Sequence, residues 1–201
     1  MVGKHVLIGD ITNTLNAINL DTGKLDWEFG FSDVNGSTSA PVCADPVCYV
    51  IDAVGLLVAV DVRAASLVTT DADPLGPLLW DTSLRTDNDA DSFQRRPLMV
   101  KGNYIYATTN YVDGNANATI QILDRESGVL VHTIALGEIA LGVPVVKDNL
   151  LLVATLTSIR AYSIDSYELM WQTDFDGSND LWATNDMALA GNIIVDHLTR
   201  S

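Results

Sequence analysis

The chain has 201 residues, 48% hydrophobic and 18% charged, which is enough to bury the core of one large all-β domain or two small ones. Its 11 basic and 26 acidic residues give a formal net charge of −15, which argues against nucleic acid and anionic membrane surfaces as partners, because both are polyanions. The N-terminus lacks the apolar core and cleavage site of a secretory signal, and no apolar tract reaches the roughly 20 residues of a bilayer span.

Short strands joined by tight turns follow one another along the chain, and their pattern repeats. The spacing between equivalent positions is close to 42 residues, with one longer interval, which is typical of propeller blades of four strands. The best-defined copy predicts strands over 96–100, 103–109, 118–124 and 129–134. No sustained window shows the i, i+3, i+4, i+7 apolar pattern of an amphipathic helix.

The sequence therefore predicts an all-β chain, a single β-propeller domain over residues 1–201 built from four-stranded antiparallel blades. It holds about four blade-lengths. The expected blade units are roughly 1–36, 37–85, 92–137 and 140–176, with a partial unit at 183–201.

The third and fourth strands of each predicted blade carry the repeat that is easiest to recognise. Its first copy, AINLDTGKLDW at 17–27, places Gly23 where a hairpin needs positive φ and ends on a Trp. We expect this Trp to wedge between neighbouring blades, with its indole N–H reaching a backbone acceptor. The positions predicted to form this docking motif are Ala17, Gly23, Trp27, Asp61, Trp80, Asp124, Gly128, Asp165 and Trp171.

This motif resembles the tryptophan-docking motif of the pyrroloquinoline-quinone (PQQ)-type β-propellers, Ala-x-Asp-x-x-x-Gly-Lys-x-x-Trp. The first copy departs from it only in having Asn19 for Asp. The third copy keeps Asp124 and Gly128 but has His132 for Trp. The fourth copy is interpreted as a shortened turn anchored at Asp165 and ending at Trp171.

The resemblance implies a ring of seven or eight blades, more than this chain contains. Three arrangements remain open: a piece of a longer propeller, two chains closing an eight-bladed ring, or a small four-bladed ring. The first two are favoured, so the expected partner is a second copy of the chain or the remainder of a longer propeller. The resemblance also points to a bacterial periplasmic or extracellular location.

Two cysteines flank a predicted turn and face each other across a hairpin. Cys43 and Cys48 either form a cross-strand disulfide or remain two small reduced strand residues. Their spacing comes with no second cysteine pair and no neighbouring histidine, so a zinc site is not expected.

A charged loop is the main candidate for binding, because loops on a rigid β scaffold usually carry function. Three of its residues, Asp87, Asp89 and Asp91, alternate like the start of a calcium loop, but the later Gly and Glu of such a loop are missing. The full candidate set is Arg85, Asp87, Asp89, Asp91, Phe93, Arg95 and Arg96.

Two functions follow from these features. The first is a non-catalytic scaffold that binds a protein or small ligand through its blade-connecting loops, with no cofactor. The alternative is part of a PQQ- and calcium-dependent alcohol or sugar dehydrogenase, as the family resemblance implies. No catalytic residue of that family can be carried over to a position in this sequence.

Overall fold

The computed structural model describes residues 3–31, 38–52, 54–65, 78–85, 93–111 and 118–175, with the short segments 181–183, 188–190, 193–195 and 198–200. They form two compact units. Unit 1 comprises Met1–Arg95 and Arg125–Val129, and unit 2 comprises Arg96–Asp124 and Leu130–Ser201. Within the described residues, helix is limited to the four residues of α1 (Val62–Ala65).

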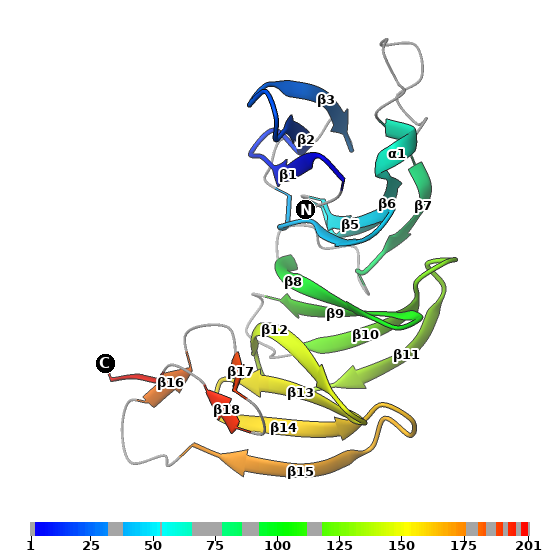
Figure 1. Ribbon diagram of the computed structural model, residues 1–201. Helices are drawn as coiled ribbons and strands as arrows, with labels where there is room; N and C mark the ends of the chain where they lie inside the picture. The colour runs from blue at the N-terminus through cyan, green and yellow to red at the C-terminus, as the bar shows by residue number, and fades with distance from the viewer. Residues whose placement is uncertain are drawn as a thin grey trace. The chain divides into compact units, whose positions relative to one another are not determined.

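Unit 1 contains two antiparallel sheets, drawn from blue to green in Figure 1. Sheet 1 has three strands in chain order, β1 (His5–Gly9), β2 (Thr14–Asn19) and β3 (Leu25–Gly30). Sheet 2 has four, β4 (Val42–Ala44), β5 (Val47–Ile51), β6 (Leu56–Asp61) and β7 (Leu78–Ser83).

Two further four-stranded sheets follow in chain order. Sheet 3 consists of β8 (Phe93–Lys101), β9 (Tyr104–Tyr111), β10 (Thr119–Asp124) and β11 (Leu130–Ala135). Sheet 4 consists of β12 (Ala140–Lys147), β13 (Leu150–Thr155), β14 (Ser158–Ser163) and β15 (Leu169–Asp174). Near the C-terminus, β16 (Leu181–Ala183) pairs with β19 (Leu198–Arg200), and β17 (Ala188–Ala190) pairs with β18 (Ile193–Val195).

This architecture confirms the predicted all-β fold of short antiparallel meanders. The strands predicted for the third unit match β8–β11, whose observed ends differ from the predicted ones by at most three residues. Sheet 1 has one strand fewer than the predicted four-stranded blade.

The middle strands of sheets 2, 3 and 4 are largely buried on both faces, because they carry nearly continuous apolar runs. In β6 the four central residues, LVAV, are all buried. Apolar side chains of sheets 1 and 2 then share one core in unit 1, formed by Leu15, Ala17, Trp27, Phe29, Cys48, Val50, Val58, Val60 and Val62. The removal of these side chains from water contributes most of the free energy that holds sheets 1 and 2 together.

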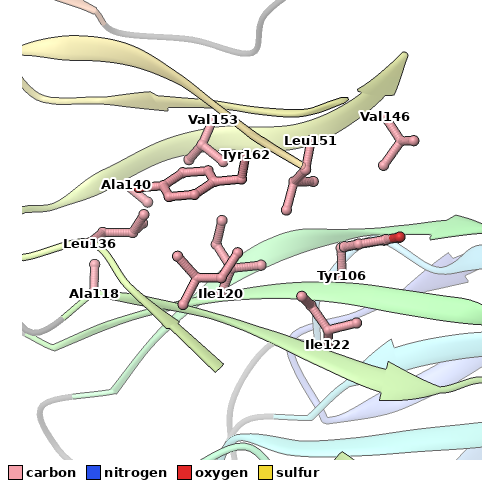
Figure 2. Close-up of a cluster of buried hydrophobic side chains, with 11 residues drawn as sticks. Tyr106, Ala118, Ile120, Ile122, Leu136, Ala140, Val146, Leu151, Val153 and Tyr162 are labelled. Atoms are coloured by element: carbon pink, nitrogen blue, oxygen red, sulfur yellow. The ribbon is translucent and has the colours of Figure 1, made fainter. Parts of the chain in front are cut away.

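Unit 2 repeats this arrangement between sheets 3 and 4. Figure 2 shows the side chains of Tyr106, Ile120 and Ile122 pointing toward those of Leu151, Val153 and Tyr162. A polar contact reinforces the core: the buried Asn110 side chain donates to the Ala140 carbonyl (2.8 Å) and accepts from the Ala140 N–H (3.1 Å). This paired hydrogen bond fixes the position of sheet 4 against sheet 3.

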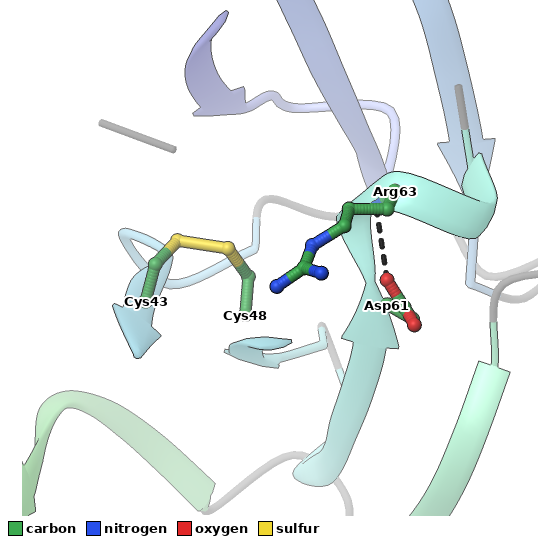
Figure 3. Close-up of a disulfide and its surroundings, with 4 residues drawn as sticks. All are labelled: Cys43, Cys48, Asp61 and Arg63. Carbon is green, nitrogen blue, oxygen red and sulfur yellow. Dashed lines mark hydrogen bonds between the residues drawn. A yellow bond between two sulfur atoms is a disulfide. The ribbon is translucent and has the colours of Figure 1, made fainter. Parts of the chain in front are cut away.

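Cys43 and Cys48 form a disulfide across the β4–β5 hairpin, as one of the two sequence alternatives predicted (Figure 3). They are direct cross-strand partners with a Cα–Cα distance of 4.1 Å. Close by, the Arg63 N–H donates to the Asp61 carboxylate at 2.9 Å, and the Arg63 guanidinium lies 3.8 Å from Asp45.

Reducing the Cys43–Cys48 bond should lower the free energy of unfolding by about 2 kcal/mol, since the bond closes a short loop and constrains the unfolded chain only modestly. Urea unfolding with and without a phosphine reductant measures this. A Cys43→Ala/Cys48→Ala variant is the control and should not respond to the reductant. Coincident curves for the wild type would contradict the prediction.

Candidate functional site

The docking motif occupies the same position in all four sheets. In each, the last two strands pair in one register interrupted by a bulge, so that the first and last motif residues lie opposite each other. The opposed pairs are Ala17–Trp27, Ala59–Trp80, Ile122–His132 and Ala161–Trp171. Trp80 keeps this place although a longer insertion precedes it in the sequence.

Residue size explains why alanine faces tryptophan. In sheet 2, Ala59 lies between Tyr49 and Trp80 in a cross-strand row, and its small side chain lets the two rings approach to a centroid distance of 5.8 Å. In sheet 3 the smaller His132 ring faces the larger Ile122. The summed volume of the pair is thereby roughly maintained, as close packing requires.

The fourth copy of the motif has the same length as the first, which corrects the sequence interpretation. The register places Ser163, not Asp165, at the position of Asn19. Asn19 Oδ1 accepts the N–H groups of Asp21 and Thr22, and Ser163 Oγ accepts those of Asp165 and Ser166. The sequence reasoning looked for a carboxylate, whereas the turn needs only a side-chain acceptor, which a serine hydroxyl provides.

The fifth residue of these turns, counted from the acceptor, has a left-handed backbone. Gly23 (φ 68°) and Gly128 (φ 71°) occupy it in the first and third copies, and Tyr167 (φ 59°) in the fourth. A gapless alignment of residues 161–171 with 17–27 would have revealed this equivalence from the sequence.

A docking contact of tryptophan on glycine is present within unit 1. A Cβ built on Gly128 would lie 2.5 Å from Trp80 Cε3, so only glycine allows the ring to sit against this turn. The Thr82 hydroxyl, two residues after Trp80, donates to the Gly128 carbonyl at 2.9 Å. Trp80 and Thr82 together therefore recognise the glycine turn by shape and by one hydrogen bond.

Unit 2 makes the corresponding contact with different side chains. His132, at the tryptophan position, stacks on Tyr167, at the glycine position, with ring centroids 4.4 Å apart and planes at 14°. Burial raises the pKa of the Tyr167 phenol, and negative charge on Tyr104 and Asp165 raises it further, so Tyr167 stays neutral at pH 7.

The expected hydrogen bond of the docking indole is not formed. The indole Nε1 atoms of Trp27 and Trp80 are buried and find no partner among the described residues. Packing fixes these rings instead: Trp27 is 7% exposed within the core of unit 1, and Trp80 lies between Tyr49 and Gly128. Trp171 differs, since it is 38% exposed.

The turn between β1 and β2 is held by one carboxylate at the opposite end of β2 from the docking turn. Asp10 Oδ1 accepts from the Thr12 N–H, the Thr12 hydroxyl and the Thr14 N–H at 2.8–3.0 Å, and Oδ2 accepts from Asn16 Nδ2 at 2.9 Å. The hydrogen bond from Thr12 is the main cause that lowers the pKa of Asp10. The support that Asp10 gives is therefore present at neutral pH and is lost as the pH falls through the lowered pKa.

Ile11 lies at the tip of this turn and is 79% exposed, more than any other large apolar side chain of the described residues. Phe31 and Thr38 lie beside the turn, because the Phe31 N–H donates to the Asn13 carbonyl and the Thr38 N–H to the Asp10 carbonyl. The turn is thus rigid at its base and presents an apolar side chain outward.

Other charged and polar side chains near the strand ends form hydrogen bonds with nearby backbone groups. Asp52 Oδ1 accepts the N–H groups of Val54 and Leu56, while its buried Oδ2 finds no partner among the described residues. Arg160 pairs with Glu138 and donates to the Leu136 carbonyl. Within the described part of the chain, no three His, Cys, Asp or Glu side chains gather as a metal site would require.

The predicted binding loop falls largely outside the described residues. Asp87, Asp89 and Asp91 lie there, and for Phe93, Arg95 and Arg96 only the backbone, as part of β8, is described. Arg85 is described: its N–H donates to Ser83 Oγ at 3.3 Å. The loop begins at the same end of sheet 2 as the Asp52–Gly55 turn, because the Leu84 N–H donates to the Gly55 carbonyl.

Comparison with known proteins identifies the fold. No family model and no curated protein sequence matches the chain. Among solved structures it is similar to BamB from Moraxella catarrhalis, with a TM-score of 0.65 and 16% identity over 96% of this chain and 54% of that one. It is also similar to the quinohemoprotein alcohol dehydrogenase from Comamonas testosteroni, with a TM-score of 0.68 and 14% identity over 98% of this chain and 38% of that one.

A computationally designed protein, Ika8, is similar at a TM-score of 0.67 and 15% identity, over 96% of this chain and 52% of that one. These likenesses show that the chain has a β-propeller fold, and the four sheets are its blades. The chain spans about half or less of the length of these solved structures. No helix in the described residues combines the length and apolarity needed to cross a bilayer.

Replacing Gly128 by Ala should lower the free energy of unfolding by about 2–4 kcal/mol, because the new Cβ is strained at positive φ and collides with Trp80. Gly102→Ala is the matched control: φ is 59° there and a Cβ would meet nothing within 4 Å. It should cost only about 1 kcal/mol. Denaturant unfolding of both variants gives the comparison, and equal losses would show that the docking contact adds nothing.

The His132–Tyr167 stack should contribute a coupling free energy of about 0.5–1.5 kcal/mol. A double-mutant cycle of His132→Ala and Tyr167→Ala in denaturant unfolding measures it. Tyr167→Phe keeps the ring and should retain most of the coupling with His132. Additive losses in the Ala cycle would contradict the prediction.

Proposed function

We propose that this chain is a non-catalytic propeller module that binds a protein or peptide ligand through its blade-connecting turns and loops. The observation that carries the proposal is Ile11, which is 79% exposed on a turn whose base is fixed by Asp10. An apolar side chain held outward by a rigid turn loses little conformational entropy when it is buried by a partner.

The position of this turn also supports the proposal. It lies at the end of sheet 1 where β3 ends, beside the segment leading to sheet 2. The charged loop that begins at Arg85 leaves sheet 2 from the corresponding end. One edge of unit 1 therefore carries both an apolar anchor and the start of the charged loop, a combination typical of binding surfaces with an apolar centre and a polar rim.

The alternative function is part of a PQQ- and calcium-dependent alcohol or sugar dehydrogenase. Its support is the fold that the chain shares with the quinohemoprotein alcohol dehydrogenase structures. In the described residues, no three His, Cys, Asp or Glu side chains come together.

A random-peptide phage library selected on the purified chain tests the binding proposal. We expect the enriched peptides to bind Ile11→Asp about tenfold more weakly or worse, since an anchor residue typically contributes 2 kcal/mol or more. Leu20→Asp is the matched control, because Leu20 is 47% exposed at the opposite end of β2, and it should leave binding unchanged.

Loss of binding in Leu20→Asp but not in Ile11→Asp would contradict the proposal, as would a failure to enrich any peptide. The same preparation is incubated with PQQ, Ca²⁺, ethanol or glucose and an artificial electron acceptor. Turnover in that assay would support the dehydrogenase alternative instead.

A further inference from the structure

One docking ring and one docking turn have no docking partner among the described residues. The two are complementary to each other. Trp171 on β15 is 38% exposed, whereas Trp27 at the same position of β3 is 7% exposed. All six residues of β15 are exposed, while β3 buries the face that carries Trp27 and Phe29. The outer strand of sheet 4 therefore presents an exposed docking face within the part of the chain that the structure describes.

The matching acceptor is the turn of sheet 1. Gly23 has φ 68°, close to the 71° of Gly128, and a Cβ built on it would meet nothing within 4 Å. On Gly128 the same Cβ would collide with Trp80. Gly23 thus has the conformation of an occupied docking glycine but no aromatic ring against it.

The strand that carries Trp171 also has the second residue that the occupied contact uses. In the occupied contact, Trp80 packs on Gly128 and Thr82, two residues later, donates to its carbonyl. Sheet 4 repeats this spacing with Trp171 and Thr173, both exposed. The other two outer strands do not, since β3 has Phe29 and β11 has Ile134 at the position of Thr82.

We propose that two copies of this chain associate as a twofold dimer, with Trp171 and Thr173 of each copy docking on the Gly23 turn of the other. The second copy is favoured as the occupant because the chain itself carries the vacant acceptor. Because each copy supplies both Trp171 and the Gly23 turn, the interface is isologous and closes by a twofold axis. It concerns the sheet faces, not the loops, and is independent of the proposed ligand binding.

Sedimentation equilibrium of the full chain over a range of concentrations tests the proposal. We expect a dimer of the 21.7 kDa chain, and Trp171→Ala should raise its dissociation constant about thirtyfold or more, as truncation of a central tryptophan does. Met170→Ala is the matched control, because Met170 is 58% exposed on the opposite face of the same strand. Thr173→Val, a smaller change, provides a second variant if Trp171→Ala fails to fold.

The acceptor side is tested by Gly23→Asn. Asparagine tolerates positive φ, so the monomer should fold, but its Cβ would collide with the docking ring as at Gly128. Gly102→Asn is the control, since Gly102 has φ 59° and the same open surroundings. Gly23→Asn should weaken the dimer at least as much as Trp171→Ala, and Gly102→Asn should leave it unchanged.

Mixing the two disabled variants separates this contact from any other interface. Trp171→Ala copies keep the acceptor and Gly23→Asn copies keep the donor, so the mixture can form one intact contact where neither variant alone can form any. We expect dimer to reappear in the mixture. A wild-type monomer at all concentrations, a dimer insensitive to both variants, or no recovery on mixing would each overturn the proposal.

Discussion

Each of the two units contains a contact between an outer-strand ring and a hairpin turn, and this contact constrains the residues on both of its sides. Three positions are matched in size: the ring, the residue opposite it in its own sheet, and the turn residue that receives it. Trp80 has Ala59 beside it and Gly128 beneath it, while the smaller His132 has Ile122 and Tyr167. Because protein interiors are close-packed, a larger residue at one position requires a smaller one at another.

The turn that receives the ring is determined by its hydrogen bonds and not by a particular residue type. Asn19 and Ser163 accept the same two backbone N–H groups through an amide oxygen and a hydroxyl. Tyr167 then adopts the left-handed conformation usually taken by glycine, which costs about 1 kcal/mol. Stacking against His132 offsets a cost of that size.

The sequence predicted the strands and their repeat because both depend on local apolar patterns and on glycine at positive φ. It also predicted that Trp27 and Trp80 belong to one motif. It did not identify Ser163 and Tyr167, since aligning residues by type overlooks a hydroxyl and an aromatic that perform the tasks of a carboxylate and a glycine. The exposed Ile11 was also missed, because one apolar residue in a polar turn has no signal until the hydrogen bonds of Asp10 are known.

The end of a sheet that carries the docking turn and the opposite end are under different structural constraints, as the two ends of β2 show. At its Asn19 end the turn must keep a fixed shape, because a ring packs on the equivalent turns of sheets 3 and 4. At its Thr14 end no sheet-to-sheet ring contact is made by the described residues, and hydrogen bonds to the Asp10 carboxylate hold the turn. Side chains such as Ile11 can therefore vary there without disturbing the packing of the sheets. A propeller built on these docking contacts thus separates the surfaces that hold its blades together from the surfaces available for binding.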